Sequence, residues 1–543
     1  MLASTCLEKY QSNKRFTLAR RALSAIILIA FATQSLAQAN RPAPTLSPGA
    51  TGALPALGDN SDLTALKERR LGDRIALGIY RDPDYVDDPV LDDYLQGIWR
   101  PLIAAARARG ELAAELDERF AWQLFLIRDR SVNAFALPGG YFGIHLGLVA
   151  AVDSSDELAA VLAHELSHVT QRHISRLLTQ QTRQTPLLVA AMLLGMLAAS
   201  KNPQAGSAAI VGGQALAAQG QLNFSRDMER EADRVGFGVM TDAGYASRGV
   251  SSMFEKLQQA SRLNDNGLFP YLRSHPLTTE RIAEAQARVQ LASPLPPAAP
   301  EAALASTAPA GDDAAMLHAL MAGRARVLAP AGVDTLRALV GDAQRQPAGP
   351  ANARTAGALY AGALAAAHLR EFASAKSLLD RLTPVAASRP RAGKAVALLA
   401  IEVDLLEGRV APRAMAADIG KAASRAELLL EAKSLLAAGR AAEVSQALQS
   451  RVAAHPRDAA AWQTLAVAYG QQNQPLRAIR ADAESRAAQL DYAGALDRFK
   501  AAQSLVRANP AGADHVEGSI IDSRARQIEL ILKEQALQDK IDR

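Results

Sequence analysis

Hydrophobic and polar positions divide the chain into a mixed region and a helical region. From residue 62 to residue 291, apolar side chains at helical spacing alternate with a run that predicts strands, Phe125 to Ile144, which is punctuated by Asp129 and by Pro138-Gly139-Gly140. From Ala314 onward, nearly all apolar residues fall at helical spacing, with short breaks. The pattern predicts an α+β domain followed by an all-α domain.

Two stretches rich in proline and alanine predict linkers around the first of these domains. They are residues 38–61 and residues 292–313. The predicted domains are therefore residues 62–291 and residues 314–543.

The helical region carries a weak internal repeat. The turns expected at Gly439 and Asn473 are 34 residues apart, which is the length of a tetratricopeptide repeat. Because the register is imperfect and an expected proline is missing, an irregular helical bundle remains the alternative to a tetratricopeptide-type solenoid. The residues at the spacings of the repeat are Trp462, Leu465, Ala466, Tyr469, Ala478, Ala495, Phe499 and Ala502.

Residues 1–37 predict a signal peptide. Basic residues, from Lys14 to Arg21, precede an apolar run from Ala22 to Phe31, and Ser35-Leu36-Ala37 supplies small residues at the cleavage positions. The apolar run is shorter than the roughly 20 residues that span a membrane. An uncleaved anchor is the alternative interpretation.

Removal of this segment changes the charge and cysteine content. Residues 1–37 carry five basic and one acidic side chain, so without them the net charge of +5 falls to +1 and gives no case for nucleic-acid binding. The single cysteine, Cys6, also lies there. A mature chain without cysteine excludes disulfides, thiolate metal sites and a cysteine nucleophile, and it suits an oxidising compartment.

The candidate chemistry begins with the motif His164-Glu165-Leu166-Ser167-His168. Ser154 and Glu157 form a capping box that predicts the start of a helix through this motif. Positions i and i+4 share one helical face, so His164 and His168 can hold one metal ion. Zinc binds neutral imidazoles and lowers the pKa of water to about 7, and Glu165 can then take up the proton and pass it to the leaving amine.

A third ligand is needed, because two helical histidines can equally be core or surface residues. His173 follows His164 by nine residues, whereas metzincins place a histidine at ten after a glycine, and here that glycine position is Gln171. We therefore expect the helix to continue to His173, which is then rotated by roughly 140° from His168. This excludes His173 as a ligand and makes it a cation at the helix end.

Glu229 is the second candidate for the third ligand. Glu229 and Asp233 are i and i+4 on another predicted helix, so the glutamate can bind zinc while the aspartate accepts a hydrogen bond from a ligand imidazole. Glu231 lies about 200° around the helix from Glu229 and is expected to face away. The alternative is a solvated acidic start of a helix.

The sequences HELSHVTQRH and FSRDMEREAD resemble the HExxH…ExxxD family of zinc metallopeptidases, which includes the CAAX prenyl proteases. The resemblance implies a zincin-like α+β domain with one Zn²⁺, bound by His164, His168 and Glu229, with Glu165 and Asp233 as catalytic residues. In this family a histidine of a His-Pro motif completes the site. Here that histidine is His275, followed by Arg281.

Three roles remain open for His275. It could stabilise the oxyanion, occupy the open zinc position as a fourth ligand and silence the enzyme, or simply be a turn residue before Pro276. The preceding residues 264–267 look flexible, so displacement of His275 is plausible.

Two further segments carry open expectations. Residues 186–218 hold two apolar runs, each too short for a membrane span, that predict either buried core helices or a mobile hairpin meeting a membrane or an unfolded client. The family resemblance places Asn133 to Ala136 on an edge strand to which a substrate can add.

The order of signal peptide, catalytic domain and repeats resembles that of family members that act in the periplasm. It implies a metalloendopeptidase, with a chaperone-like role, for unfolded or stalled outer-membrane proteins, which the repeats would hold. The resemblance also implies that the repeats contact the outer-membrane assembly machinery. It implies a location at the inner face of the outer membrane, with peripheral membrane contact. The alternative function is a tetratricopeptide scaffold or chaperone with a latent or silenced zinc site.

Overall fold

The computed structural model describes residues 64–180, 226–262, 269–292, 309–347, 352–410, 419–422, 424–508 and 514–541. The predicted signal peptide and first linker lie outside these residues. So do the 186–218 segment, the stretch 264–267 and most of the second linker.

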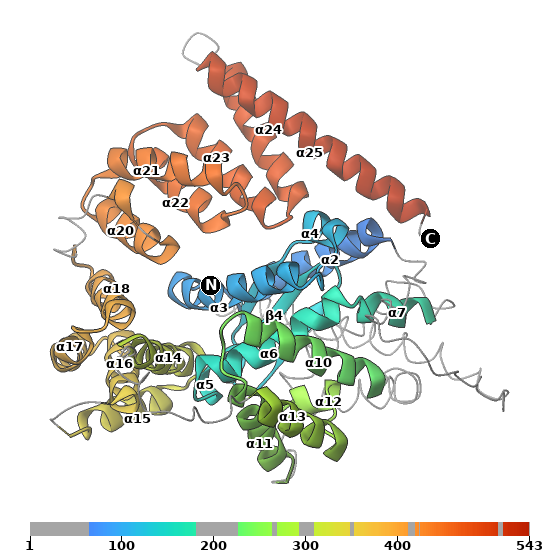
Figure 1. The fold of residues 1–543 in the computed structure, drawn as a ribbon. Coiled ribbons are helices and arrows are strands. Elements are labelled where there is room, and N and C mark those ends of the chain that lie inside the picture. The colour runs from blue at the N-terminus through green and yellow to red at the C-terminus, as the bar shows by residue number, and fades with distance from the viewer. Residues whose placement is uncertain are drawn as a thin grey trace, which may run out of the picture.

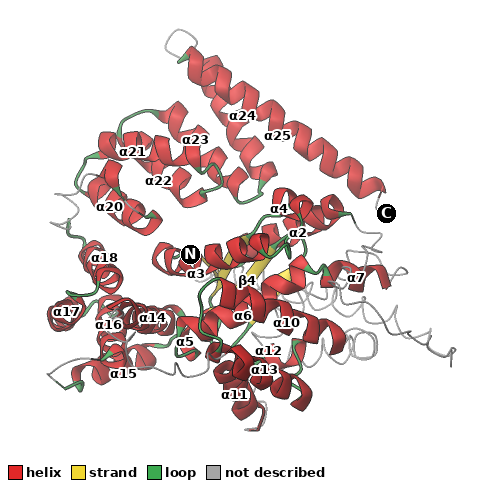
Figure 2. Ribbon diagram, in the orientation of Figure 1, coloured by secondary structure: helices red, strands yellow, loops and turns green. Residues whose placement is uncertain are grey.

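A small mixed sheet lies at the centre of the N-terminal α+β region (Figure 2). Its strand order is β1-β2-β4-β3, with β2 and β4 parallel and the two outer pairs antiparallel. The elements of this region are α2 (Ala65–Tyr80), β1 (Tyr85–Val86), α3 (Pro89–Ala108), α4 (Ala114–Arg119), β2 (Gln123–Ile127), β3 (Ala134–Leu137), β4 (Tyr141–His145), α5 (Leu146–Ala151), α6 (Ser155–Thr170), α7 (His173–Gln180), α10 (Arg226–Asp242), α11 (Arg248–Arg262), α12 (Tyr271–Ser274) and α13 (Thr279–Ala292).

The predicted strand run contains three of the four strands. Gly139 and Gly140 have φ of 75° and 77° and form the turn between β3 and β4. Gly143 is required on β4, because a Cβ there would lie 1.9 Å from the ring of Phe135 on the neighbouring strand. Strand β3 is the outer strand of the sheet and contains part of the predicted edge segment.

The C-terminal region is helical throughout its described residues, as the apolar spacing predicts. The turns expected at Gly439 and Asn473 are present, with φ of 76° and 54°. The elements are α14 (Pro309–Leu328), α15 (Val333–Gln344), α16 (Ala353–His368), α17 (Phe372–Ala386), α18 (Pro390–Glu407), a 3₁₀ turn (Ile419–Lys421), α20 (Arg425–Ala437), α21 (Ala441–Ala454), α22 (Ala459–Gln471), α23 (Pro475–Ala488), α24 (Tyr492–Ala508) and α25 (His515–Ile541).

The first helices of the C-terminal region share a hydrophobic core with the N-terminal region. Helix α14 begins at Pro309, earlier than the expected boundary at residue 314, and lies beside α5 (Figure 1). One cluster of buried apolar side chains runs from the helices around the sheet into α14, α16, α17 and α18, whereas α20 to α23 mainly form a second cluster. The change of sequence pattern near residue 300 therefore does not coincide with a break in the core.

The later C-terminal helices arch over α3 and return to the start of the described chain (Figure 1). At one end, Arg425 Nη2 donates a hydrogen bond to Asp87 Oδ2 at 3.0 Å. At the other end, helix α25 meets helix α2, where Arg70 pairs with Glu534 and Arg74 pairs with Asp539. All four of these last side chains are at least partly exposed to solvent.

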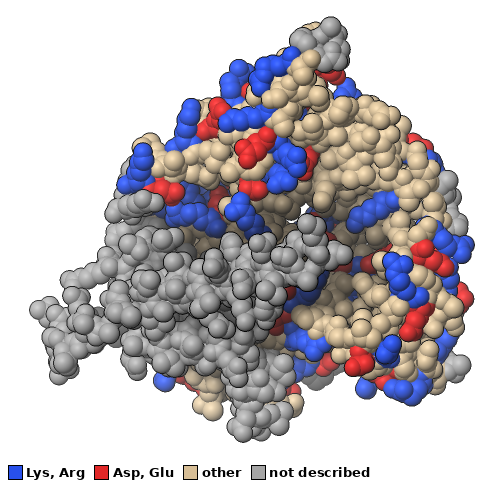
Figure 3. Space-filling view, turned by 180° about the vertical axis from the view of Figure 1, so that it is seen from behind, with Lys and Arg blue, Asp and Glu red and all other residues tan. Residues whose placement is uncertain are grey.

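Among the described residues that Figure 3 shows, basic and acidic side chains lie interspersed, with other residues between them. Within the part of the chain that the structure describes, no helix has the length and apolar character needed to cross a membrane.

A buried ion network joins the two regions through Arg324 of α14. Arg324 is 2% exposed and donates to both carboxylate oxygens of Asp88, at 2.9 and 2.6 Å, and to Glu402 at 2.7 Å. Asp88 also accepts from the backbone amide of Leu91 at 2.8 Å and so begins helix α3. One arginine therefore balances two carboxylates from different parts of the chain.

Replacing Arg324 by methionine is expected to lower the free energy of unfolding by about 3–5 kcal/mol, because the buried carboxylate of Asp88 and the partly buried carboxylate of Glu402 lose their partner. Urea denaturation followed by circular dichroism measures the change. Arg345→Met is the matched control, since Arg345 pairs with Asp342 at the surface, where both side chains are largely exposed. Equal stability of the two variants would contradict the role given to Arg324.

Candidate active site

Helix α6 carries the histidine motif and is buried along most of its length. Ser154 accepts a hydrogen bond from the amide of Glu157 at 3.2 Å, and the Glu157 carboxylate accepts from the amide of Asp153 at 2.8 Å. The predicted N-cap at Ser154 is thus confirmed, whereas the Glu157 carboxylate bonds to the amide of Asp153, one residue before the N-cap. His164, Glu165 and His168 are all less than a tenth exposed.

Helix α10 lies against α6 and brings Glu229 to the histidines. Ala232 is fully buried, and a Cβ on Gly236 would lie 3.0 Å from both the carbonyl oxygen of Ala163 and the amide nitrogen of His164. These two small residues let the helix backbones approach closely. Glu229, 2% exposed, lies on the same face of α10 and points at α6.

His275 follows the short helix α12 and is 4% exposed. Its Nδ1 lies 3.3 Å from His164 Nε2 and 3.1 Å from Glu229 Oε1. Its Nε2 lies 3.4 Å from Glu165 Oε1. The ring therefore stands between the histidine helix and the glutamate helix, in contact with both.

The four side chains converge on one point in the described structure. His164 Nε2 and His168 Nε2 are 3.0 Å apart, and the Glu229 oxygens lie 3.4 Å from the former and 3.5 Å from the latter. One donor atom from each of His164, His168, Glu229 and His275 lies within 4.8 Å of every other. Three imidazoles and a carboxylate are a donor set that zinc prefers, so these residues fit a zinc ion.

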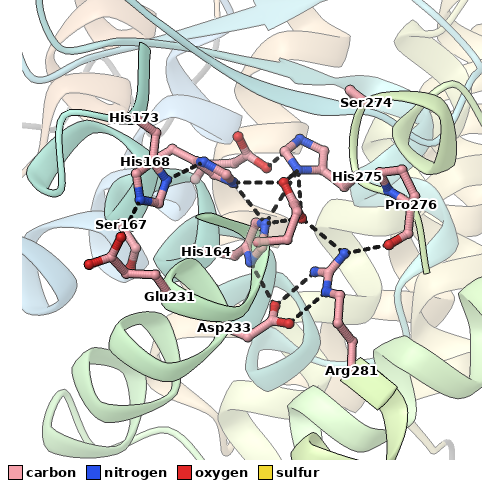
Figure 4. A network of polar contacts seen from close by, with 12 residues as sticks. His164, Ser167, His168, His173, Glu231, Asp233, Ser274, His275, Pro276 and Arg281 are labelled. Carbon is pink, nitrogen blue, oxygen red and sulfur yellow. Dashed lines mark hydrogen bonds and ion pairs between the residues drawn. The ribbon is translucent and has the colours of Figure 1, made fainter. Parts of the chain in front are cut away.

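Asp233 and Arg281 form a polar layer behind this cluster (Figure 4). Asp233 Oδ1 lies 3.0 Å from His164 Nδ1, so the carboxylate can orient that ring with its Nε2 toward the cluster. Arg281 donates to both oxygens of Asp233, at 2.6 and 2.8 Å, and its Nη1 lies 2.9 Å from Glu229 Oε2. One guanidinium thus holds Glu229 and Asp233, two of the acidic residues of α10.

The pKa values of the two glutamates move in opposite directions. Burial raises the pKa of Glu165, against the effect of the nearby imidazoles of His275 and His164. Burial would raise the pKa of Glu229 as well, but the imidazoles of His275, His164 and His168 hold that pKa well below its usual range. A raised pKa suits a group that takes up and returns a proton, and a lowered pKa suits a metal ligand.

The structure corrects the expectation for His173. Helix α6 ends at Thr170, and Arg172 adopts a left-handed φ of 54°, so α7 starts in a new direction at His173. His173 is fully buried, and burial lowers its pKa, so it is not a cation at a helix end. Its Nδ1 lies 2.8 Å from Nδ1 of His168, and it does not belong to the four-residue cluster.

Glu231 faces away from the cluster, as its position on α10 predicts, and it meets His173 instead. Its Oε2 lies 3.0 Å from His173 Nε2 and 2.7 Å from Arg176 Nη2. This contact could not be predicted from the sequence, because a left-handed non-glycine residue at a helix end carries no local signal.

Tyr271 is a site residue that the sequence analysis did not single out. It is 5% exposed, and its ring stacks on His275 with centroids 4.6 Å apart and planes inclined by 28°. Tyr271 precedes His275 by one helical turn of α12, a spacing that could have drawn attention to it.

Known proteins are similar to this chain over the region that contains the site. Residues 93–289 match the model of peptidase family M48, and this range contains every site residue described above. Residues 93–289 are therefore similar to the kind of peptidase that the motifs predicted.

Individual relatives match over part of the chain. A Vibrio cholerae protein, named as a candidate beta-barrel assembly-enhancing protease, is 36% identical over 235 residues, 43% of this chain and 46% of the relative. The beta-barrel assembly-enhancing protease of Escherichia coli is 32% identical over 244 residues, 45% of this chain and 48% of the relative. The mitochondrial metalloendopeptidase OMA1 of Arabidopsis thaliana is 28% identical over 195 residues, 36% of each chain. The chain spans about half the length of the first two relatives.

Glu229→Gln is expected to lower the zinc content of the purified protein sharply, because a neutral amide is a poor zinc ligand and α10 offers no other carboxylate at this point. Mass spectrometry of bound metal after gel filtration measures it. Asp227→Asn is the control, since Asp227 lies on the same helix in an exposed pair with Arg230. Full zinc content in Glu229→Gln would remove Glu229 from the proposed ligands.

Proposed function

We propose that the chain, whose residues 93–289 match the model of peptidase family M48, is a zinc-dependent metalloendopeptidase. The observation that carries the proposal is the buried convergence of His164, His168, Glu229 and His275, with Glu165 beside them. A family match alone would leave open whether the site is intact. The geometry supports an intact donor set.

We assign His164, His168 and Glu229 as the zinc ligands. When bound, zinc supplies the Lewis acidity that polarises a peptide carbonyl and makes a water molecule acidic enough to attack it. Asp233 holds the ring of His164 through Nδ1, which leaves Nε2 free of hydrogen for the metal. Arg281 keeps Asp233 and Glu229 ionised in this buried layer.

Glu165 is the proton carrier in this proposal. Its carboxylate is buried beside the cluster, and its raised pKa makes it a stronger base than an exposed glutamate. It takes one proton from the attacking water and delivers it to the nitrogen of the leaving amine. The second proton of the water leaves the new carboxylic acid and is taken up by the amine, so the products are a carboxylate and an ammonium terminus.

Two alternative roles for His275 bear on this reaction. It either stabilises the oxyanion or occupies the open zinc position as a fourth ligand. Its Nδ1 lies among the donor atoms of the cluster, which supports a fourth ligand that occupies the position needed by the substrate. A site closed in this way rests inactive until His275 moves. The placement equally supports the second candidate function, a scaffold or chaperone with a silenced zinc site.

For the C-terminal region we propose a tetratricopeptide-type solenoid. The helices form antiparallel pairs, and the repeat positions Trp462, Leu465 and Tyr469 of α22 are buried against their neighbours. Phe499 of α24 is buried at the matching position of the next unit. Such solenoids bind extended or unfolded chains on their concave faces.

The cellular setting is proposed from the relatives and the N-terminal pattern. Residues 1–37 are proposed as a signal peptide, followed by linker 38–61, a peptidase domain at 62–291, a second linker and the repeats to residue 543. The relatives' names refer to beta-barrel assembly, so we propose a periplasmic protein that processes unfolded or stalled outer-membrane proteins, in contact with their assembly machinery at the inner face of the outer membrane. The chain has no feature that calls for nucleic acid.

Glu165→Gln is expected to keep zinc and fold while losing most proteolysis, because only the proton carrier is removed. Cleavage of an unfolded test protein such as reduced casein measures turnover, with metal content measured on the same sample. Glu157→Gln is the control, because Glu157 is buried two turns earlier on α6 and serves the helix start. Near-normal turnover in Glu165→Gln would exclude the proposed role and weaken the enzyme assignment.

His275→Ala separates the two roles of His275. If this residue closes the site, the variant should cleave casein or itself faster than the wild type while three ligands still hold zinc. If it stabilises the oxyanion, turnover should fall by about 10²–10³-fold. Combining His275→Ala with Glu165→Gln should abolish any gain in cleavage. Unchanged turnover and unchanged zinc affinity would contradict both roles.

A further inference from the structure

We infer that His173 and Glu231 are positioning residues that hold the ring of His168 in the orientation and tautomer needed for metal binding. The inference rests on the proposed zinc site and extends it beyond the metal ligands and Asp233. It assigns a role to two residues that the sequence placed outside the site.

The position of His173 results from the break between helices α6 and α7. Because Arg172 has a left-handed backbone, the chain turns sharply after Gln171 and returns His173 beside His168. Helix α7 then places Arg176 one turn later on the same side. His173 has no exposed surface, so its ring nitrogens must find partners within the protein.

His168, His173 and Glu231 form a chain of hydrogen bonds, and the direction of each bond follows from the carboxylate of Glu231 at its end. An ionised carboxylate only accepts, so Glu231 Oε2 accepts from His173 Nε2, 3.0 Å away. In a neutral imidazole the other nitrogen is then an acceptor, so Nδ1 of His173 accepts from Nδ1 of His168 at 2.8 Å. His168 therefore carries its hydrogen on Nδ1 and presents an unprotonated Nε2.

Nε2 is the atom of His168 that faces the cluster. It lies 3.0 Å from His164 Nε2 and 3.5 Å from Glu229 Oε1. The contacts behind the ring thus select the tautomer that can bind a metal in front of it.

Glu231 is itself held in place. Arg176 donates to the same oxygen at 2.7 Å, and this positive charge holds the carboxylate as an acceptor. The chain of contacts therefore ends in a fixed charge.

The two ligand histidines are consequently supported in different ways. His164 meets the carboxylate of Asp233 directly, whereas His168 reaches the carboxylate of Glu231 through a second imidazole (Figure 4). Both carboxylates belong to α10, two residues apart, and they lie on different sides of the helix. One helix thus supplies a ligand, Glu229, and the outer support of both histidines.

Zinc affinity of the full chain, measured by competition with a chelating dye, tests this inference. His173→Leu should weaken zinc binding by about 10–100-fold, the usual effect of losing an outer partner, and should shift the absorption bands of the Co²⁺-loaded protein. His173→Gln should stay within about threefold of the wild type, because one amide can both accept and donate. His318→Leu is the control for loss of a buried histidine, since His318 contacts Tyr94 and a backbone carbonyl far from α10.

Glu231→Leu provides a second test if His173→Leu fails to fold. It should weaken zinc binding by about 3–10-fold, and Asp227→Leu on the exposed side of α10 should not. Wild-type zinc affinity and an unchanged Co²⁺ spectrum in His173→Leu, or in Glu231→Leu, would overturn the inference. So would an equal loss in His173→Gln and His173→Leu, since packing alone would then explain it. A wild-type protein that binds no zinc would instead refute the proposed metal site itself.

Discussion

The close approach of helices α6 and α10 is the constraint on which the site depends. A Cβ at Gly236 would lie 3.0 Å from the backbone of α6, which is tighter than an ordinary contact, and Ala232 is packed in the same contact. With the backbones this close, Glu229 reaches both histidines, although its side chain is shorter than an arginine or lysine. Ligands on two packed helices cannot move independently, so the metal geometry is built into the backbone packing. A larger residue at Gly236 would separate the helices and open the ligand set.

Close packing also buries several charges, and the surrounding residues have to balance them. Glu229 and Asp233 are less than a tenth exposed, and a buried carboxylate without a partner is strongly destabilising. Arg281 supplies one positive charge for the two of them. A divalent cation held by the imidazoles and Glu229 would supply the remainder. The same side chains that orient the ligands therefore also make their burial tolerable.

The parts of this arrangement that follow local rules could be predicted from the sequence. The capping residues set the start of α6, the i, i+4 spacing put His164 with His168, and the same spacing put Asp233 behind Glu229. The contact between His173 and His168 could not be predicted, because it requires a left-handed Arg172 where the sequence shows no glycine. Nor could the pairing of Arg324 with Asp88, since those residues are distant in sequence and meet only in the shared core. Local periodicity predicts which face a residue occupies, whereas tertiary contacts decide what it meets there.

The two ends of the C-terminal region are attached to the peptidase region by different physical means. Helix α14 is joined through buried apolar contacts and the Arg324 network, so separating it would expose apolar surface and leave buried charges unpaired. Helix α25 meets α2 through partly exposed ion pairs such as Arg74 with Asp539, which exchange readily with water. Any rearrangement of the helical region therefore costs least at its C-terminal end. The shared core around α14 would stay with the helices that carry the metal ligands, so the site can keep its geometry while the far end of the helical region moves.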